Sequence, residues 1–199
     1  MKFVDVLFAR GYHKLDVLAP PQIPRKGPAI LISNHTSGLD PLLIQAPLNR
    51  VVVWMMAKEY YNIKLLKPFF KILEIIPVDR SSRDSGSMRL ALRALQEGRL
   101  LGIFPEGRIE TKRELLPFQH GVAQMAIKAG VPVYPTFLDG TQHGLGDMVP
   151  AFAHRQVATV RYGPPLTLSQ ADGKGSFETA TAQLRAAVLN LRTPRFSPV

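Results

Sequence analysis

Residues 28–41 read PAILISNHTSGLDP, and this stretch decides the fold class and places the first candidate site. Its apolar run, residues 29–33, predicts a buried strand. The serine and glycine that follow favour a turn. Asp40-Pro41 is typical of a helix start, because proline suits the first helical position and the helix dipole stabilises a carboxylate there. A strand that turns directly into a helix is a building unit of α/β sheets.

The rest of the chain continues this alternation of short apolar runs and helical patterns. Three amphipathic stretches predict helices: one begins within 81–87 and ends at Gly98, one spans 118–129, and one spans 176–192. We therefore expect a single α/β domain over residues 1–199, with a mostly parallel central sheet flanked by helices. The runs that predict the remaining strands are 51–56, 75–78, 100–104, 131–137 and 157–162.

The charge balance predicts an anionic partner. The 199 residues contain 25 Lys and Arg against 15 Asp and Glu, for a formal net charge of +10. Such a charge attracts nucleic acid, a phospholipid surface or a phosphorylated substrate. Nucleic acid is disfavoured, because the sequence carries no stacking-aromatic motif and no recognition helix. The absence of cysteine excludes disulfides, thiolate metal sites and cysteine nucleophiles.

Two segments combine basic and apolar residues in a way that predicts contact with a membrane surface. Residues 1–15 have the spacing of an amphipathic N-terminal helix, which would pack either on its own domain or on lipid. Residues 63–71 set three lysines among bulky apolar side chains. Charged residues interrupt every apolar run before the roughly 18 to 20 residues of a spanning helix, so no transmembrane helix is expected.

The end of the first strand carries an imidazole and a carboxylate. His35 and Asp40 would lie about 140° apart on a continuous helix, so the turn between them must bring them together. A carboxylate that accepts a hydrogen bond from imidazole fixes its tautomer and stabilises the imidazolium during proton transfer. No Gly-x-Ser-x-Gly motif supplies a serine, so His35 would deprotonate a substrate hydroxyl directly. These two residues are equally consistent with a helix cap beside a loop histidine.

Charged residues also follow three other predicted strands. In residues 104–108, Phe-Pro-Glu-Gly-Arg, Arg108 is suited to bind a phosphate, and Glu106 to bond a substrate hydroxyl or orient the arginine. A surface Glu–Arg turn pair is the alternative. Arg80 and Lys58 each follow a strand, where a single charge is usually only solvated. Together, these strand ends predict a phosphate pocket beside a base. The other four histidines lack metal-ligand spacing, so no metal is expected.

Several segments form an ordered set along the chain. They are Asn34-His35 followed by Asp40, Ala57-Lys58-Glu59, Ile75-Ile76-Pro77-Val78-Asp79-Arg80, Phe104-Pro105-Glu106-Gly107, Leu116-Pro117-Phe118-Gln119-His120-Gly121 and Val131-Pro132-Val133-Tyr134-Pro135. This set resembles the motif blocks of the glycerolipid acyltransferases typified by 1-acylglycerol-3-phosphate acyltransferase. The resemblance covers residues 28–167, which we take as the family core.

The resemblance implies a reaction and a set of roles. His35, held by Asp40, would remove a proton from the free hydroxyl of a lysophospholipid, and the alkoxide would attack the thioester of acyl-CoA or an acyl carrier protein. The product with 1-acyl-sn-glycerol 3-phosphate would be phosphatidic acid, and no cofactor would be needed. The family's acceptor site maps onto Arg80, Glu106, Gly107 and Arg108, with Lys58 as a further candidate.

One departure from the family pattern leaves the acceptor open. The usual block has a threonine or serine between glycine and arginine, whereas Arg108 follows Gly107 immediately. Glycerol 3-phosphate and other lysophospholipids are therefore alternative acceptors. An inactive peripheral membrane-binding protein is the alternative from another class. For the enzyme, we expect a peripheral protein on the cytoplasmic face of an anionic membrane, where an intracellular acyl donor is available.

Overall fold

The computed structural model describes residues 13–65, 67–80, 84–111, 114–141, 155, 157–169 and 176–192. Within them, seven strands form one sheet in the order β1-β7-β6-β2-β5-β3-β4. Every neighbouring pair is parallel except β6 and β7. The predicted α/β fold with a mostly parallel sheet is confirmed. The strands are β1 (Lys14–Ala19), β2 (Ala29–Ser33), β3 (Val52–Ala57), β4 (Ile76–Val78), β5 (Leu100–Ile103), β6 (Val133–Asp139) and β7 (Val157–Tyr162).

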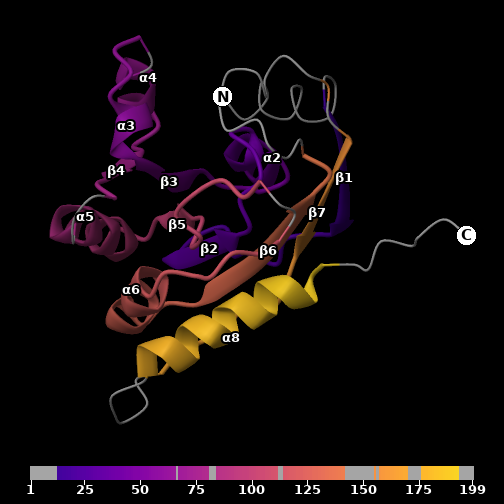
Figure 1. Cartoon of the computed structure of the whole chain (residues 1–199). Helices are drawn as coiled ribbons and strands as arrows, with labels where there is room; N and C mark the ends of the chain where they lie inside the picture. Colours follow the sequence, from indigo (N-terminus) through magenta and orange to yellow (C-terminus); the bar gives the residue numbers. More distant parts are fainter. Residues whose placement is uncertain are drawn as a thin grey trace, which may run out of the picture.

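Helices cover both faces of the sheet. On one face, α5, α6 and α8 pack against apolar side chains of the central strands, including Ile30, Ile32 and Leu101. On the other face, α2 buries Leu43 and Ile44 against the sheet. Figure 1 shows α8 running along the sheet and α3 and α4 standing out from the ends of β3 and β4. The helices are α2 (Asp40–Gln45), α3 (Lys58–Tyr61), α4 (Lys67–Ile72), α5 (Ser85–Gln96), α6 (Gly121–Ala129) and α8 (Ser176–Asn190).

The N-terminal expectation is partly wrong. Residues 1–12 of the amphipathic helix predicted over 1–15 lie outside the described residues. Lys14 and Leu15, however, belong to strand β1, where Leu15 is buried and aligned with Ala158 of the parallel strand β7. Side chains alternate in burial along the start of this strand, so its period is two and not that of a helix. The segment is a strand because it pairs with β7, about 140 residues away in the chain. The local sequence does not indicate this partner.

The other elements lie close to their predicted positions. Strand β6, which was predicted over residues 131–137, is shifted by two residues to Val133–Asp139, and α5 begins at Ser85, within the predicted range. The side chain of Asp84 caps α5 by accepting hydrogen bonds from the backbone N–H groups of Gly86 and Ser87, at 2.9 and 3.0 Å. The two short helices α3 and α4 were not predicted. Among the described residues, no helix combines the length and apolarity that crossing a bilayer requires.

Candidate active site

The candidate site lies where four parallel strands end. Strands β2, β5, β3 and β4 are consecutive neighbours in the sheet, so their carboxyl ends meet at the same edge. His35 follows β2, Lys58 follows β3, Arg80 follows β4, and residues 104–108 follow β5. Open α/β sheets bind ligands at such edges. The structure thus brings together at one edge the four groups of residues that the sequence analysis singled out.

A buried carboxylate holds the imidazole of His35. The Nδ1 atom of His35 lies 3.0 Å from Oδ2 of Asp40, and the Asp40 side chain is fully buried. The same oxygen accepts backbone N–H groups of Thr36 and Ser37, at 2.6 and 2.9 Å. The turn predicted from sequence therefore folds around the carboxylate and fixes it. With Nδ1–H donating to Asp40, Nε2 of His35 is the nitrogen that can accept a substrate proton.

A stack of three aromatic rings fixes the plane of the imidazole. The His35 ring lies 4.0 Å from the ring of Phe104, with 14° between the planes, and Phe104 stacks in turn on Trp54 at 5.0 Å. Gly102 leaves room for the indole, because a Cβ atom there would lie 2.5 Å from Trp54. The His35 side chain remains 17% exposed. The imidazole is thus held on two sides and still open to solvent.

The loop after β5 holds the main chain of His35 through hydrogen bonds of Glu106 and Glu110, and we call this arrangement the clamp. Oε1 of Glu106 accepts the N–H of His35 at 2.8 Å, and the N–H of Glu110 donates to the carbonyl oxygen of His35 at 2.7 Å. Oε2 of Glu106 accepts the N–H of Leu116, also at 2.8 Å. With 4% of its surface exposed, Glu106 is a positioning residue in this structure. Its predicted contact with the acceptor stays a prediction.

Burial gives Glu106 an unusual protonation equilibrium. The pKa of Glu106 is raised from 4.5 to about 7, chiefly by loss of hydration on burial, and the nearby carboxylates of Glu110 and Asp40 act in the same direction. The N–H donors of Leu116 and His35 favour the charged form and act in the opposite direction. The clamp therefore contains a group that titrates near neutral pH, and no feature of the sequence indicates this.

Two further positioning residues were missed by the sequence analysis. The side chain of Asn34 both donates to the carbonyl oxygen and accepts the N–H of Leu138, each at 2.8 Å, and so joins the end of β2 to β6. Arg185 of α8 donates to the carbonyl oxygens of Leu115 and Leu116, at 2.6 and 3.2 Å. It therefore supports the segment that bonds Glu106. The asparagine is the first residue of the Asn-His pair, but nothing local marks Arg185.

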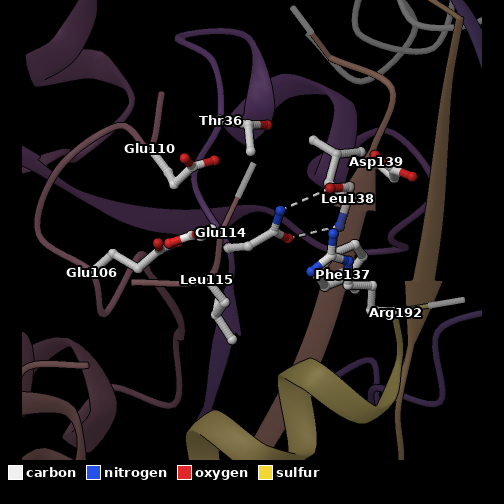
Figure 2. Close-up of a pocket in the computed structure, with 10 residues that line it drawn as sticks. Thr36, Glu106, Glu110, Glu114, Leu115, Phe137, Leu138, Asp139 and Arg192 are labelled. Carbon is white, nitrogen blue, oxygen red and sulfur yellow. Dashed lines mark hydrogen bonds between the residues drawn. The ribbon is translucent and has the colours of Figure 1, made fainter. Parts of the chain in front are cut away.

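A small cavity of about 90 Å³ adjoins the clamp. Figure 2 shows the carboxylates of Glu106 and Glu110 on one side of it and Leu138 and Arg192 on the other. The dashed lines in Figure 2 are the paired hydrogen bonds to Leu138. His35 does not line this cavity. The cavity therefore gives no access to the imidazole among the residues that line it.

Hydrogen bonds and ion pairs link most of the predicted cationic residues at this edge. Arg80 donates to the carbonyl oxygen of Gly107 at 3.1 Å and lies 3.6 Å from a carboxylate oxygen of Glu59. The ammonium of Lys58 lies 3.5 Å from Oδ2 of Asp79, the residue before Arg80. Arg108 is exposed and forms no ion pair within the described part of the chain. At this edge, among the described residues, Lys58 and Arg80 are each paired with a carboxylate, and the Arg108 guanidinium is available for an anion.

A held imidazole beside cationic strand ends, on a mostly parallel sheet, is a site suited to reactions at a hydroxyl of a phosphorylated substrate. The chain belongs to the Acyltransferase family, whose model matches residues 14–139. It is 28% identical to the 1-acyl-sn-glycerol-3-phosphate acyltransferase of Borreliella burgdorferi over 65% of this chain and 53% of that protein. It is 26% identical to the Escherichia coli enzyme of the same name over 87% of this chain and 70% of that protein.

A solved structure has the same fold. The crystal structure of the 1-acyl-sn-glycerophosphate (LPA) acyltransferase PlsC from Thermotoga maritima superimposes with a TM-score of 0.72 at 20% identity. The match covers 98% of this chain and 81% of the other. Against the curated relatives from Borreliella burgdorferi and Mycoplasma pneumoniae, the chain spans about half of their length, 53% and 52%.

Proposed function

We propose that this protein transfers an acyl chain from a thioester to the free hydroxyl of 1-acyl-sn-glycerol 3-phosphate and so forms phosphatidic acid. The observation that carries the proposal is the contact of His35 with the buried carboxylate of Asp40, at 3.0 Å. Relatives that match most of the chain are named for this reaction, among them the Escherichia coli protein. We propose acyl-CoA or an acyl carrier protein as the donor, with no cofactor.

The geometry supports a general-base mechanism. Nε2 of His35 takes the proton from the acceptor hydroxyl as the oxygen forms its bond to the thioester carbonyl carbon. The negative charge of Asp40 stabilises the imidazolium that results. When the tetrahedral intermediate collapses, the carbon–sulfur bond breaks and the imidazolium returns the proton to the departing thiolate. Atoms and charge balance without a covalent acyl-enzyme, so no serine or cysteine nucleophile is required.

The cationic strand ends supply the acceptor phosphate site in this proposal. Arg108 is exposed and unpaired within the described residues, which leaves its guanidinium free to bind phosphate oxygens in bidentate fashion. Arg80 is anchored to Gly107 and adds a second positive charge, and Lys58 contributes from the end of β3. The acceptor is a membrane lipid, so we also propose that the protein works as a peripheral protein on the cytoplasmic face of an anionic membrane.

A second acceptor class follows from one observation in the sequence. The residue between glycine and arginine in the usual third block is absent, which brings Arg108 one position closer to Gly107. Gly107 has a φ of 70°, so the chain turns at this residue. The direction of the Arg108 side chain, and hence the position of its guanidinium relative to the acceptor, depends on this turn. Glycerol 3-phosphate or a lysophospholipid with a larger headgroup is therefore the alternative acceptor, and direct comparison of acceptors decides between them.

The test is acceptor-dependent release of CoA thiol from a long-chain acyl-CoA in detergent micelles. We expect release with the native chain, and a loss of about 100- to 10,000-fold with His35→Ala, because the base is removed. Asp40→Asn is compared with Asp16→Asn, an exposed residue of β1 that serves as the matched control. Silence with acyl-CoA, acyl carrier protein and all acceptors would refute the proposal and favour an inactive membrane-binding protein.

A further inference from the structure

The helices α3 and α4 form a projection whose apolar side chains face solvent. We call the described residues 58–65 and 67–72 the α3–α4 projection. Figure 1 shows it standing away from the sheet. Leu65 is 88% exposed and Ile72 is 73% exposed, and Ile63 is 40% exposed. Large apolar side chains with this exposure on one short projecting segment are a candidate interaction surface.

The projection does not need these side chains for its own packing. The ring of Phe70 is buried and stacks on Tyr61, with 6.1 Å between centroids, which holds α4 against α3. The backbone N–H of Lys67 donates to the carbonyl oxygen of Ile63 at 2.9 Å, and Ile75 bonds back to Phe70 at 3.0 Å. Aromatic stacking and backbone hydrogen bonds therefore define the shape of the projection and leave Leu65 and Ile72 available to a partner.

The charges around the apolar side chains are positive. Lys64 and Lys71 are exposed, and no carboxylate of the described residues lies within ion-pair distance of either. The ammonium of Lys67 lies 3.5 Å from the amide oxygen of Asn62. The nearby acids are engaged elsewhere, since Glu59 pairs with Arg80 and Glu74 with Arg99. Exposed apolar side chains on the same segment as unneutralised lysines are complementary to the acyl region and headgroups of an anionic bilayer.

The base of the projection is joined to the candidate active site. Helix α3 begins at the carboxyl end of β3, the same edge of the sheet at which β2 delivers His35. The ion pairs Lys58–Asp79 and Arg80–Glu59 connect α3 to the end of β4, and Arg80 bonds Gly107 of the loop after β5. A bilayer in contact with the projection would therefore face the edge that carries the base.

We propose that the α3–α4 projection docks the protein on anionic phospholipid bilayers, with Leu65 and Ile72 entering the acyl region and Lys64 and Lys71 lying among the phosphates. The inference rests on the proposed function only for its consequence, which is delivery of a bilayer-resident acceptor to His35. An acidic protein would satisfy the lysines but leave the two most exposed apolar side chains in water. The apolar component therefore favours a bilayer over an acidic carrier protein.

The experiment is cosedimentation of the full chain with vesicles of phosphatidylcholine containing 30 mol% phosphatidylglycerol. We compare the double variant Leu65→Ser/Ile72→Ser with Leu18→Ser/Leu90→Ser, which removes two leucines that are 51% and 47% exposed on β1 and α5. The first variant is expected to lower the partition coefficient at least tenfold, and the control less than twofold. Lys64→Gln/Lys71→Gln should reduce binding and weaken its dependence on salt.

Unchanged vesicle binding by Leu65→Ser/Ile72→Ser would overturn the proposal, as would equal losses in the two leucine variants. Loss of acyl carrier protein binding in the lysine variant, with vesicle binding intact, would overturn it in favour of a protein partner. Transfer to a short-chain acceptor in solution should be unchanged in the projection variants. The vesicle assay involves no turnover, and His35→Ala should bind vesicles like the native chain, so failure of the proposed reaction would leave the docking result interpretable.

Discussion

Replacement of Glu106 by glutamine should remove a loss of stability that the native protein undergoes as pH rises from 5 to 8, and it should also lower the activity. In the native structure the ionised carboxylate accepts two backbone N–H groups, those of His35 and Leu116, each at 2.8 Å. Burial raises the pKa of this carboxyl group to about 7, so ionising it in the folded protein costs free energy. Glutamine retains the shape and removes the charge, but its amide NH₂ faces one of the two N–H donors.

The sign and size of the stability effect follow from linkage. The folded protein binds the Glu106 proton more tightly than the unfolded chain, so this stabilisation is fully present below pH 4.5 and is lost as pH rises through about 7. Between pH 5 and pH 8 the loss amounts to about 2 to 3 kcal/mol. The free energy of unfolding of Glu106→Gln, relative to the native chain, should therefore rise by about the same amount over that interval.

The activity of Glu106→Gln should be lower than that of the native chain. At pH 8 the variant lacks one hydrogen bond between a charged acceptor and the clamp, which is worth about 1.5 to 3 kcal/mol, so kcat should fall about 10- to 100-fold. The native enzyme should lose activity as pH falls through about 7, because protonated Glu106 can no longer accept both N–H groups. That part of the pH profile should be missing in the variant.

The assays are urea denaturation at pH 5 and pH 8, and thiol release over the same range. Glu114→Gln is the matched control, because this exposed carboxylate lies on the same loop and accepts no hydrogen bond from the His35 main chain. Stability curves of Glu106→Gln that run parallel to those of the native chain would refute the assigned protonation. Full activity at pH 8 would show that the clamp is not needed for catalysis.

Three further changes test other parts of the site. Asp40→Asn should lower kcat about 1,000-fold or more with KM little changed, because the imidazolium loses its carboxylate; steady-state kinetics would contradict this by showing a KM effect alone. Arg185→Gln should lower kcat and move the Glu106 part of the pH profile to higher pH, because the segment that donates a hydrogen bond to Glu106 loosens. Arg185→Lys should restore part of the kcat and part of the native pH profile. An unaltered pH profile would show that Arg185 has only a structural role. Gly102→Ala should cost about 1 to 3 kcal/mol in urea denaturation, because its Cβ would lie 2.5 Å from Trp54; a native midpoint would contradict this contact.

The resemblance to known motif blocks predicted more of the candidate site residues than the chemistry of the individual residues did. His35 and Asp40 are close together because a turn of small residues separates the strand from a helix that begins at Asp40, and this is local information. Lys58, Arg80 and Arg108 could be placed at one edge because parallel strands end together. The role of Glu106 was not predictable in the same way, because its hydrogen-bond partners, Leu116 and His35, lie 10 and 71 residues away.

The sequence by itself determined the α/β class, most of the strands, the long helices and the imidazole–carboxylate pair, because these depend on apolar periodicity and short-range turns. The tertiary structure alone decided that Lys14 and Leu15 form a strand, since β1 exists through its pairing with β7. The tertiary structure also determined the hydrogen bonds that Asn34 and Arg185 form with backbone groups 104 and about 70 residues away in the sequence. A local pattern records which face of an element is apolar, whereas the partner of a buried polar group is chosen only when distant segments are packed together.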